Sequence, residues 1–248
     1  MEEWMQFPFI VSGYRKDIKN YREAFGTLFK IHNETANIWT MIMSFMLASS
    51  LFVYIVSFQK EHVNIVPFVL FYCANVIHLP FSLGYHLFLP ISNEIKVYWR
   101  NLDITFIFIS GTLFACALGY CVLKRILLLI LFSTCFNVSC FAIYTIRKKK
   151  NYDRVLVCKL VGIIVICYMF PMFYHAFTRY DFYSFNLGFT TCIVMGISAI
   201  VYADCIPEKY AYPPGKYDII GNSHNIMHLG LMIAYVIEYM FIYHTCKT

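Results

Sequence analysis

Two histidines four residues apart, His224 and His228, lie in the stretch GNSHNIMH at the start of a long apolar segment. On a helix this spacing stacks both imidazoles on one face, with Cβ atoms about 5–6 Å apart, so that both rings can reach one metal ion. The alternative is a pair of interfacial histidines that face water or lipid headgroups. The pair alone favours neither interpretation, and the positions of the other polar residues must decide.

Three more polar residues that could take part in a metal site lie in two other apolar segments. Ser82 and His86 are one helical turn apart near the end of one segment, and Asp103 lies at the start of the next. An ionisable residue inside a membrane span is costly and usually faces a partner or a cavity. Three imidazoles match a Zn²⁺ site that leaves a fourth position for water. Ligand type also admits iron or manganese, but an all-imidazole set without a redox partner favours zinc.

Composition indicates the class of protein that must position these side chains. Of the 248 residues, 60% are hydrophobic and only 14% are charged, which is too few to cover a water-soluble surface of this size. We therefore expect an integral membrane protein, in either the plasma membrane or an internal membrane. Seven apolar segments have about the 20 residues needed to cross the hydrocarbon: Ile38 to Val56, Ile65 to Leu87, Leu102 to Val122, Ile126 to Ile146, Val155 to Phe173, Phe185 to Ala203 and Asn222 to Tyr243.

The residues before the first span have a different pattern. From Asp17 to Ile31, Tyr21, Phe25 and Leu28 form an apolar stripe opposite charged residues, which predicts an amphipathic helix at the membrane surface. We therefore divide the chain into a cytoplasmic N-terminal segment, residues 1–37, and a seven-transmembrane helix bundle, residues 38–248. The predicted fold class is an all-α membrane protein.

The basic residues predict the orientation of the bundle. Fifteen Lys and Arg residues fall on the side of the N-terminus and five on the other side. By the positive-inside rule the N-terminus is cytoplasmic and the C-terminus is outside. The basic cluster from Arg147 to Lys150 is explained by this topology and by attraction to anionic lipid, so we expect no nucleic-acid partner.

This orientation brings the candidate site residues to one depth. His86 ends a span that runs inward, whereas His224 and His228 begin a span that runs outward, and Asp103 opens a span at the same cytoplasmic level. A common depth favours a zinc site over four unrelated interfacial residues. In this hypothesis the three histidines bind Zn²⁺, Asp103 holds or deprotonates the metal-bound water, and Ser82 adds a hydrogen bond.

Other polar groups within the apolar segments are weaker signals. His78 either lines a cavity that leads to the metal or is a hydrogen-bonded residue of the bundle, and we prefer the second interpretation. Glu238 lies ten residues, or about 15 Å, beyond His228, too far to join the metal, and is interpreted as a structural residue or one that lines the outer half. Most of the ten cysteines lie singly in apolar runs without a C-x-x-C pair, so we expect packing residues rather than disulfides.

Three motifs carry a family resemblance. The run HNETANIWT from His32 to Thr40, S-x-x-x-H followed by LD, and H-x-x-x-H occur in this order. The sequence resembles the progestin and adipoQ receptor (PAQR) family, related to the hemolysin-III proteins, over nearly the whole chain from Ser12. The resemblance implies zinc bound by three histidines, with Asp103 and Ser82 near the metal-bound water. It also implies a lipid-accessible cavity in which some members hydrolyse the amide of ceramides.

The sequence departs from the family pattern in the first motif. Met41 stands where the motif usually has a histidine, and Ala36 replaces a common glycine. Glu34 and Asn37 remain, and we interpret them as polar anchors where the surface helix turns into the first span. Adiponectin-receptor-like, progestin-receptor-like and hemolysin-like assignments all stay open.

Two functions follow from these observations. In the first, a PAQR-type receptor hydrolyses ceramide-type lipid amides: a zinc-bound water attacks the carbonyl and Asp103 carries the proton to the leaving amine. In the second, a receptor or scaffold holds a purely structural zinc ion. A transporter or channel is more remote, because no inverted repeat is detectable. We expect membrane lipids as partners. The outer loops are short, which favours a small lipid or steroid ligand that enters from the bilayer over a large protein hormone.

Overall fold

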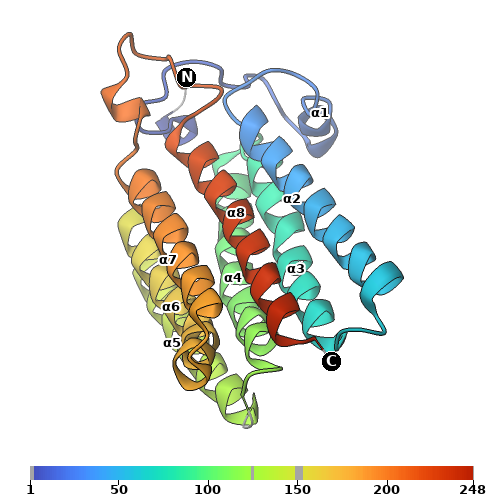
Figure 1. Cartoon of the computed structure of the whole chain (residues 1–248). Coiled ribbons are helices and arrows are strands. Elements are labelled where there is room, and N and C mark those ends of the chain that lie inside the picture. Colours follow the sequence, from blue (N-terminus) through green and yellow to red (C-terminus); the bar gives the residue numbers. More distant parts are fainter. Residues whose placement is uncertain (1–2, 124–125, 149–152, 248) are drawn as a thin grey trace.

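The computed structural model describes residues 3–123, 126–148 and 153–247, and the regular structure of this part of the chain is helical. Seven long helices within it pack side by side as an elongated bundle (Figure 1). Of the basic residues that predict the orientation, Lys124, Arg125, Lys149 and Lys150 lie outside the described residues. The helices are α1 (Tyr21–Phe25), α2 (Thr35–Tyr54) with a π-helical extension (Ile55–Gln59), α3 (Val66–Phe88), α4 (Asn93–Gly119), α5 (Ile126–Lys148), α6 (Arg154–Arg179), α7 (Phe182–Ala203) and α8 (Ser223–Thr245), with short 3-10 turns at Glu3–Met5 and Glu208–Tyr210.

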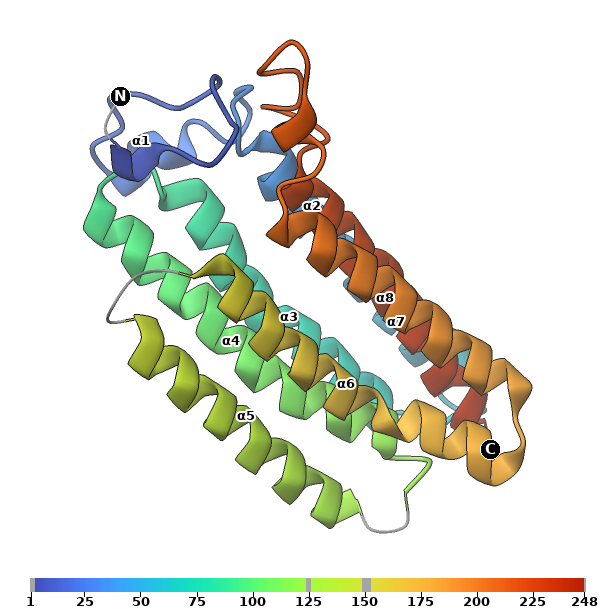
Figure 2. The same cartoon turned by 90° about the vertical axis from the view of Figure 1, so that its left-hand side faces the viewer.

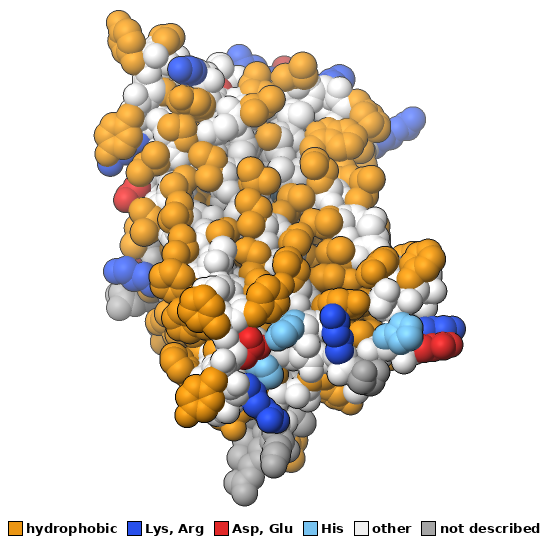
Figure 3. Space-filling view, in the orientation of Figure 1, with side chains coloured by type: hydrophobic (Ala, Val, Ile, Leu, Met, Phe, Trp, Pro, Cys, Tyr) orange, Lys and Arg blue, Asp and Glu red, His pale blue; other side chains and the backbone are white. Residues whose placement is uncertain are grey.

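Six of these helices are, among the described residues, long and apolar enough to cross a membrane: α2 with its extension, α3, α4, α6, α7 and α8. Large apolar side chains such as Phe45, Ile166 and Ile200 are exposed on their outer faces, as expected for contact with lipid. In the space-filling view, hydrophobic side chains cover much of the face turned to the viewer (Figure 3). The protein is therefore an integral, multi-pass membrane protein. The fourth of the seven expected spans, Ile126 to Ile146, coincides with α5, and its crossing of the membrane stays a prediction.

The two ends of the bundle differ in what covers them. The N-terminal segment and the connection between α7 and α8 lie together over one end, which we call the N-terminal end, and the chain finishes at the other, the C-terminal end (Figures 1 and 2). Asp218 joins the two covering segments, because its buried carboxylate accepts hydrogen bonds from the backbone N–H groups of Val11 (3.2 Å) and Ser12 (2.6 Å). The end of α3 and the start of α8 thus share one covered end.

The surface helix is shorter than the predicted range from Asp17 to Ile31, because α1 spans only Tyr21–Phe25. Asn20 caps its first turn with a side-chain oxygen. Gly26, a weak helix former, ends it. The hydroxyl of Thr27 then donates to a carbonyl of α1 and accepts from the buried Arg15, which replaces a continued α-helix by three-residue turns.

A disulfide joins Cys121, just after α4, to Cys246, just after α8. The expectation of packing residues concerned cysteines that lie singly inside apolar runs, whereas this pair lies at the ends of two spans. The two residues are 125 positions apart and follow two different spans, so no local spacing could have indicated their pairing. The other eight cysteines are free.

Candidate metal centre

The first turn of α8 is fixed by groups that satisfy its free N–H groups. The side-chain oxygen of Asn222 accepts from the backbone N–H groups of His224 (3.1 Å) and Asn225 (3.1 Å). The buried carboxylate of Glu208 accepts from the backbone N–H of Ser223 at 2.7 Å and from its hydroxyl. Negative charge at a helix N-terminus is favourable, so Glu208 stabilises this start. The GNSHNIMH stretch therefore begins a helix, as its sequence predicts.

The structure brings His86, His224 and His228 together. Their ligating nitrogens all lie within 4.8 Å of one another. The ring centroids are 4.8 Å apart for His86 and His224, 5.1 Å for His86 and His228, and 4.7 Å for the pair on α8. His86 lies in the last turn of α3, and α3 ends where α8 begins, so two helices of opposite direction place three imidazoles at the N-terminal end.

Two side chains of the first motif orient these rings. The Nδ1 of His86 is 2.8 Å from Oε2 of Glu34, and the Nδ1 of His228 is 2.8 Å from Oγ1 of Thr40. The Nε2 atom of each ring is thus left for the site. In His86 this atom is buried and has no hydrogen-bond partner among the described residues. A buried nitrogen without a partner is costly, and a metal ion would satisfy it, so the residues present fit a metal.

Glu34 also links the site to α8. Burial favours its neutral form, but hydrogen bonds with His86 and from Asn37 outweigh this effect and lower the pKa of Glu34. Asn37 donates to Glu34 at 2.8 Å and accepts from Asn225 at 2.7 Å. The sequence indicates polar anchors at Glu34 and Asn37, and the structure shows that Glu34 contacts His86 directly while Asn37 holds Glu34. A carboxylate that stays ionised holds the His86 ring in one orientation.

Asp103 lies outside the group of histidine nitrogens. Among the described residues its carboxylate is 2.7 Å from Nε2 of His78, and both side chains are partly buried. His78 precedes His86 by two turns of α3, about 12 Å along an ideal axis, with the buried Ser82 between them. The interpretation of His78 as a hydrogen-bonded residue is confirmed. The roles of Asp103 and Ser82 stay predictions.

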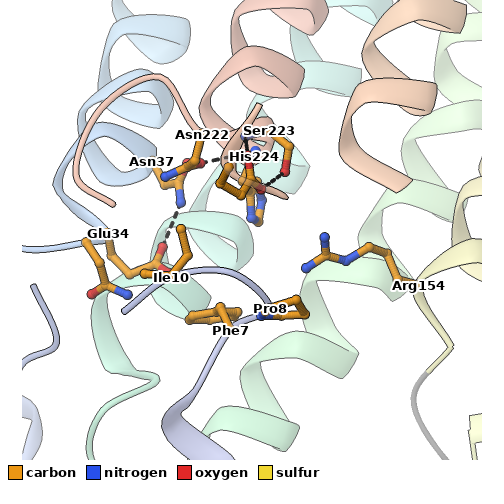
Figure 4. A pocket seen from close by; sticks show the side chains of 11 residues that line it. Phe7, Pro8, Ile10, Glu34, Asn37, Arg154, Asn222, Ser223 and His224 are labelled. Carbon is orange, nitrogen blue, oxygen red and sulfur yellow. Dashed lines mark hydrogen bonds between the residues drawn. The ribbon is translucent and has the colours of Figure 1, made fainter. Parts of the chain in front are cut away.

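A small cavity opens onto His224 from the N-terminal end (Figure 4). Its volume is about 20 Å³, which is room for one water molecule. The side chain of Arg154 faces it while donating to the carbonyl oxygen of Tyr202 at 3.1 Å. A single water can therefore reach this side of the histidine group. The other walls come from the N-terminal segment, the start of α2, the connection between α7 and α8, and the start of α8: Phe7, Pro8, Ile10, Asn33, Glu34, Asn37, Glu208, Asn222 and Ser223.

Two further residues support the histidine group through contacts that the sequence did not indicate. Thr40 is the last residue of the HNETANIWT run, and Arg15 is the last residue of the run SGYR, which begins at Ser12 where the family resemblance begins. Both residues therefore belong to recognisable motifs, but the motifs do not indicate which groups they contact. The buried guanidinium of Arg15 donates to the carbonyls of His86 (2.6 Å) and Leu87 (2.8 Å), which completes the last turn of α3. Met41 is buried, and the missing histidine there removes neither of the two hydrogen bonds that hold the rings.

A bundle of membrane-spanning helices with a buried group of three histidines at one end defines a multi-pass membrane protein with a candidate metal centre. The model of the family described as Haemolysin-III related matches residues 29–239, and the chain belongs to this family, the PAQR group. It is 27% identical to an uncharacterized protein of Schizosaccharomyces pombe, 23% to membrane progestin receptor gamma of Mus musculus and 24% to the adiponectin receptor protein of Drosophila melanogaster.

These matches cover almost all of this chain but only part of the relatives. The aligned regions cover 96%, 91% and 96% of this chain, in the same order, and 56%, 73% and 56% of the relatives. The chain thus spans little more than half the length of two of them. The comparisons define a membrane protein of this family that is similar to proteins named as receptors.

Proposed function

We propose that this protein is a PAQR-type receptor whose three histidines hold Zn²⁺ near the cytoplasmic face. We propose further that the protein hydrolyses a ceramide-type lipid amide at this site. The observation that carries the proposal is the buried, unpartnered Nε2 of His86, grouped with His224 and His228 while Glu34 holds its Nδ1. Imidazole nitrogens suit zinc, and a three-histidine set leaves a fourth position open. Relatives named as progestin and adiponectin receptors support the receptor part of the proposal.

The chain's own residues supply positioning and proton transfer. When bound, zinc would polarise the amide carbonyl and lower the pKa of a water molecule to about 7. In the proposed reaction Asp103, held by His78, accepts a proton and delivers it to the nitrogen of the leaving amine. Ser82, one turn before His86, would add a supporting hydrogen bond beside the metal. The water-sized cavity beside His224 offers a path for the water that the reaction consumes.

The proposed orientation has the N-terminal end in the cytoplasm. The excess of basic residues on that side supports it. The Cys121–Cys246 disulfide supports it independently, because disulfides persist in oxidising compartments and are rare in the cytosol. In this arrangement the C-terminal end faces outside and the histidine group faces the cytosol.

The second candidate function is a receptor or scaffold with a structural zinc ion. It is favoured by the hydrogen bond between Asp103 and His78, because this carboxylate is engaged away from the three histidine nitrogens. In this case the metal would stabilise the junction of α2, α3 and α8. Loss of a histidine would then lower stability, whereas loss of Asp103 would leave both zinc content and signalling unchanged.

A paired measurement separates the two functions. Purified, zinc-loaded protein is supplied with ceramide, and released fatty acid and bound zinc are measured together. For a hydrolase, Asp103→Asn lowers turnover about 100-fold or more at unchanged zinc content, as expected for loss of an acid–base group, and His86→Ala loses both. Glu238→Gln, a buried carboxylate bonded to Tyr168, is the matched control and retains both. Fatty-acid release that is absent at full zinc occupancy would end the hydrolase proposal.

A further inference from the structure

A second group of ligating side chains lies at the C-terminal end, away from the three-histidine centre. It consists of His175 on α6, Asp181 just before α7 and His244 near the end of α8. One ligand atom from each lies within 4.8 Å of the other two. We propose that these three residues form a second metal site, which binds a divalent transition-metal ion of the zinc type from the outer face of the protein.

The distances suit such an ion. Both imidazoles point Nε2 at the same carboxylate oxygen, Oδ2 of Asp181, at 3.3 Å from His175 and 2.7 Å from His244. Ligand atoms about 2.0–2.1 Å from a tetrahedral zinc ion lie about 3.3 Å from one another. The first distance already has this value, and the second needs an opening of about half an ångström, which a surface side chain such as His244 can provide.

The carboxylate is held in place by the start of α7. Oδ1 of Asp181 accepts from the backbone N–H groups of Tyr183 (3.0 Å) and Ser184 (3.3 Å), and Oδ2 accepts from the hydroxyl of Ser184 at 2.7 Å. Ser184 is fully buried, so this arrangement is fixed by packing. Hydrogen bonds of this kind orient a metal ligand before the ion arrives.

The end of α8 is fixed as well. Cys246, two residues after His244, is bonded to Cys121, and its carbonyl accepts from the backbone N–H of Asn64 at 3.1 Å. The ring of His244 packs edge-on against Tyr183, with centroids 4.9 Å apart. Three separate segments thus hold three ligand atoms on a rigid frame, which a metal site requires.

The site is open to solvent on one side. The side chains of His175 and Asp181 are 20% and 18% exposed, and that of His244 is 39% exposed. In the space-filling view, histidine and acidic side chains lie together near the end where the chain finishes (Figure 3). Two imidazoles and one carboxylate suit Zn²⁺ and leave a position for water or an external ligand. A purely hydrogen-bonded cluster is the competing explanation, and the experiment decides between them.

The test counts zinc ions bound by the full chain. Chelator-stripped protein in detergent is dialysed to equilibrium against Zn²⁺, and zinc per chain is measured by elemental analysis. We expect His244→Gln to bind one zinc ion fewer than the unaltered chain. His175→Ala should lower the affinity for the same ion at least tenfold, since even the loss of a supporting hydrogen bond lowers the affinity of a metal site by this much. His62→Gln, an exposed histidine at the same end, is the matched control and loses none.

The count also separates this site from the first one. His228→Ala removes the ion of the three-histidine centre only, and the double change with His244→Gln removes both. If the three-histidine centre binds no zinc, the unaltered chain holds one ion and His244→Gln holds none, which still supports the second site. Equal zinc content in the unaltered chain and in well-folded His244→Gln and His175→Ala variants would overturn it, and the cluster would then be hydrogen-bonded only.

Discussion

The Nδ1 atom of His86 lies 2.8 Å from Oε2 of Glu34, and both side chains are buried. The two residues are 52 positions apart, on α3 and immediately before α2. A carboxylate on the far nitrogen of an imidazole fixes the ring and makes its other nitrogen a better metal ligand. This pair therefore connects the first motif of the sequence to the candidate metal centre, and it is the most direct place to test that centre.

Glu34→Gln should weaken zinc binding by about 10–100-fold, the usual effect of losing such a partner. The amide of glutamine can still accept one hydrogen bond from His86, although it carries no charge. Alanine cannot accept it, so Glu34→Ala should bind zinc more weakly than Glu34→Gln. Competition with a chromophoric zinc chelator measures the affinity. Glu238→Gln makes the same chemical change at another buried carboxylate and should leave the affinity unaltered. An unchanged affinity in Glu34→Gln would show that the pair does not act on a metal.

Thr40→Val should lower zinc affinity by about tenfold, because it removes the hydroxyl that lies 2.8 Å from Nδ1 of His228 while keeping the shape of the side chain. Thr40→Ser keeps the hydroxyl and should restore most of the affinity. The same competition measurement applies. Equal affinities in the two variants would mean that packing at this position matters and the hydrogen bond does not.

Arg15→Met should destabilise the protein by about 2–3 kcal/mol, because the buried carbonyls of His86 and Leu87 lose a charged donor. Thermal unfolding in detergent, with zinc removed, measures the loss without a contribution from metal binding. Arg15→Lys can restore one of the hydrogen bonds and should be intermediate. The exposed neighbour Lys16 offers the control, since Lys16→Met should have almost no effect.

The positions of the three histidines could be predicted from the sequence because two strong signals coincide. Apolar segments of spanning length give the depth of each residue, and four-residue spacing places His224 and His228 on one helix face. The structure brings both near His86 because α3 ends where α8 begins. Only the coarse position of a residue along its span is needed for this inference.

Contacts that depend on side-chain direction could not be predicted in the same way. The carboxylate of Asp103 bonds to His78, two turns before His86 on α3, because α4 already begins at Asn93 and Asp103 lies ten residues inside it. The second cluster, at the C-terminal end, was not predicted from the sequence, because it combines a surface loop with the ends of two helices and Asp181 belongs to no motif. Depth alone does not say which side of a helix faces its neighbour.

His32 should make the stability of the protein depend on pH. It is buried, and its Nδ1 accepts from the backbone N–H of Glu34 at 3.2 Å. Burial, together with the nearby Arg15, lowers the pKa of His32 from 6.5 to about 4. The unfolded chain therefore takes up a proton more readily than the folded one. The contribution of His32 is complete above pH 6.5 and is lost as the pH falls through this window toward 4.

Unfolding temperatures measured with zinc removed should therefore fall more steeply below pH 6.5 in the unaltered chain than in His32→Gln. Other histidines titrate in both proteins, so the difference between their two curves isolates His32. His62→Gln, at an exposed position, should follow the unaltered curve. Parallel curves for the unaltered chain and His32→Gln would show that His32 is not held neutral by the fold.

The orientation can be tested at the two ends with one reagent. Lys60 and Lys16 are both exposed, and Lys60 lies at the same end of the bundle as the Cys121–Cys246 disulfide whereas Lys16 lies at the N-terminal end. On intact cells in which the protein reaches the surface, a membrane-impermeant maleimide should label Lys60→Cys at once and Lys16→Cys only after permeabilisation. Prior reduction should also expose Cys121 and Cys246 to the external reagent, and should lower stability by up to about 2–4 kcal/mol. Labelling of Lys16→Cys on intact cells would reverse the proposed topology and place the three-histidine centre at the outer face.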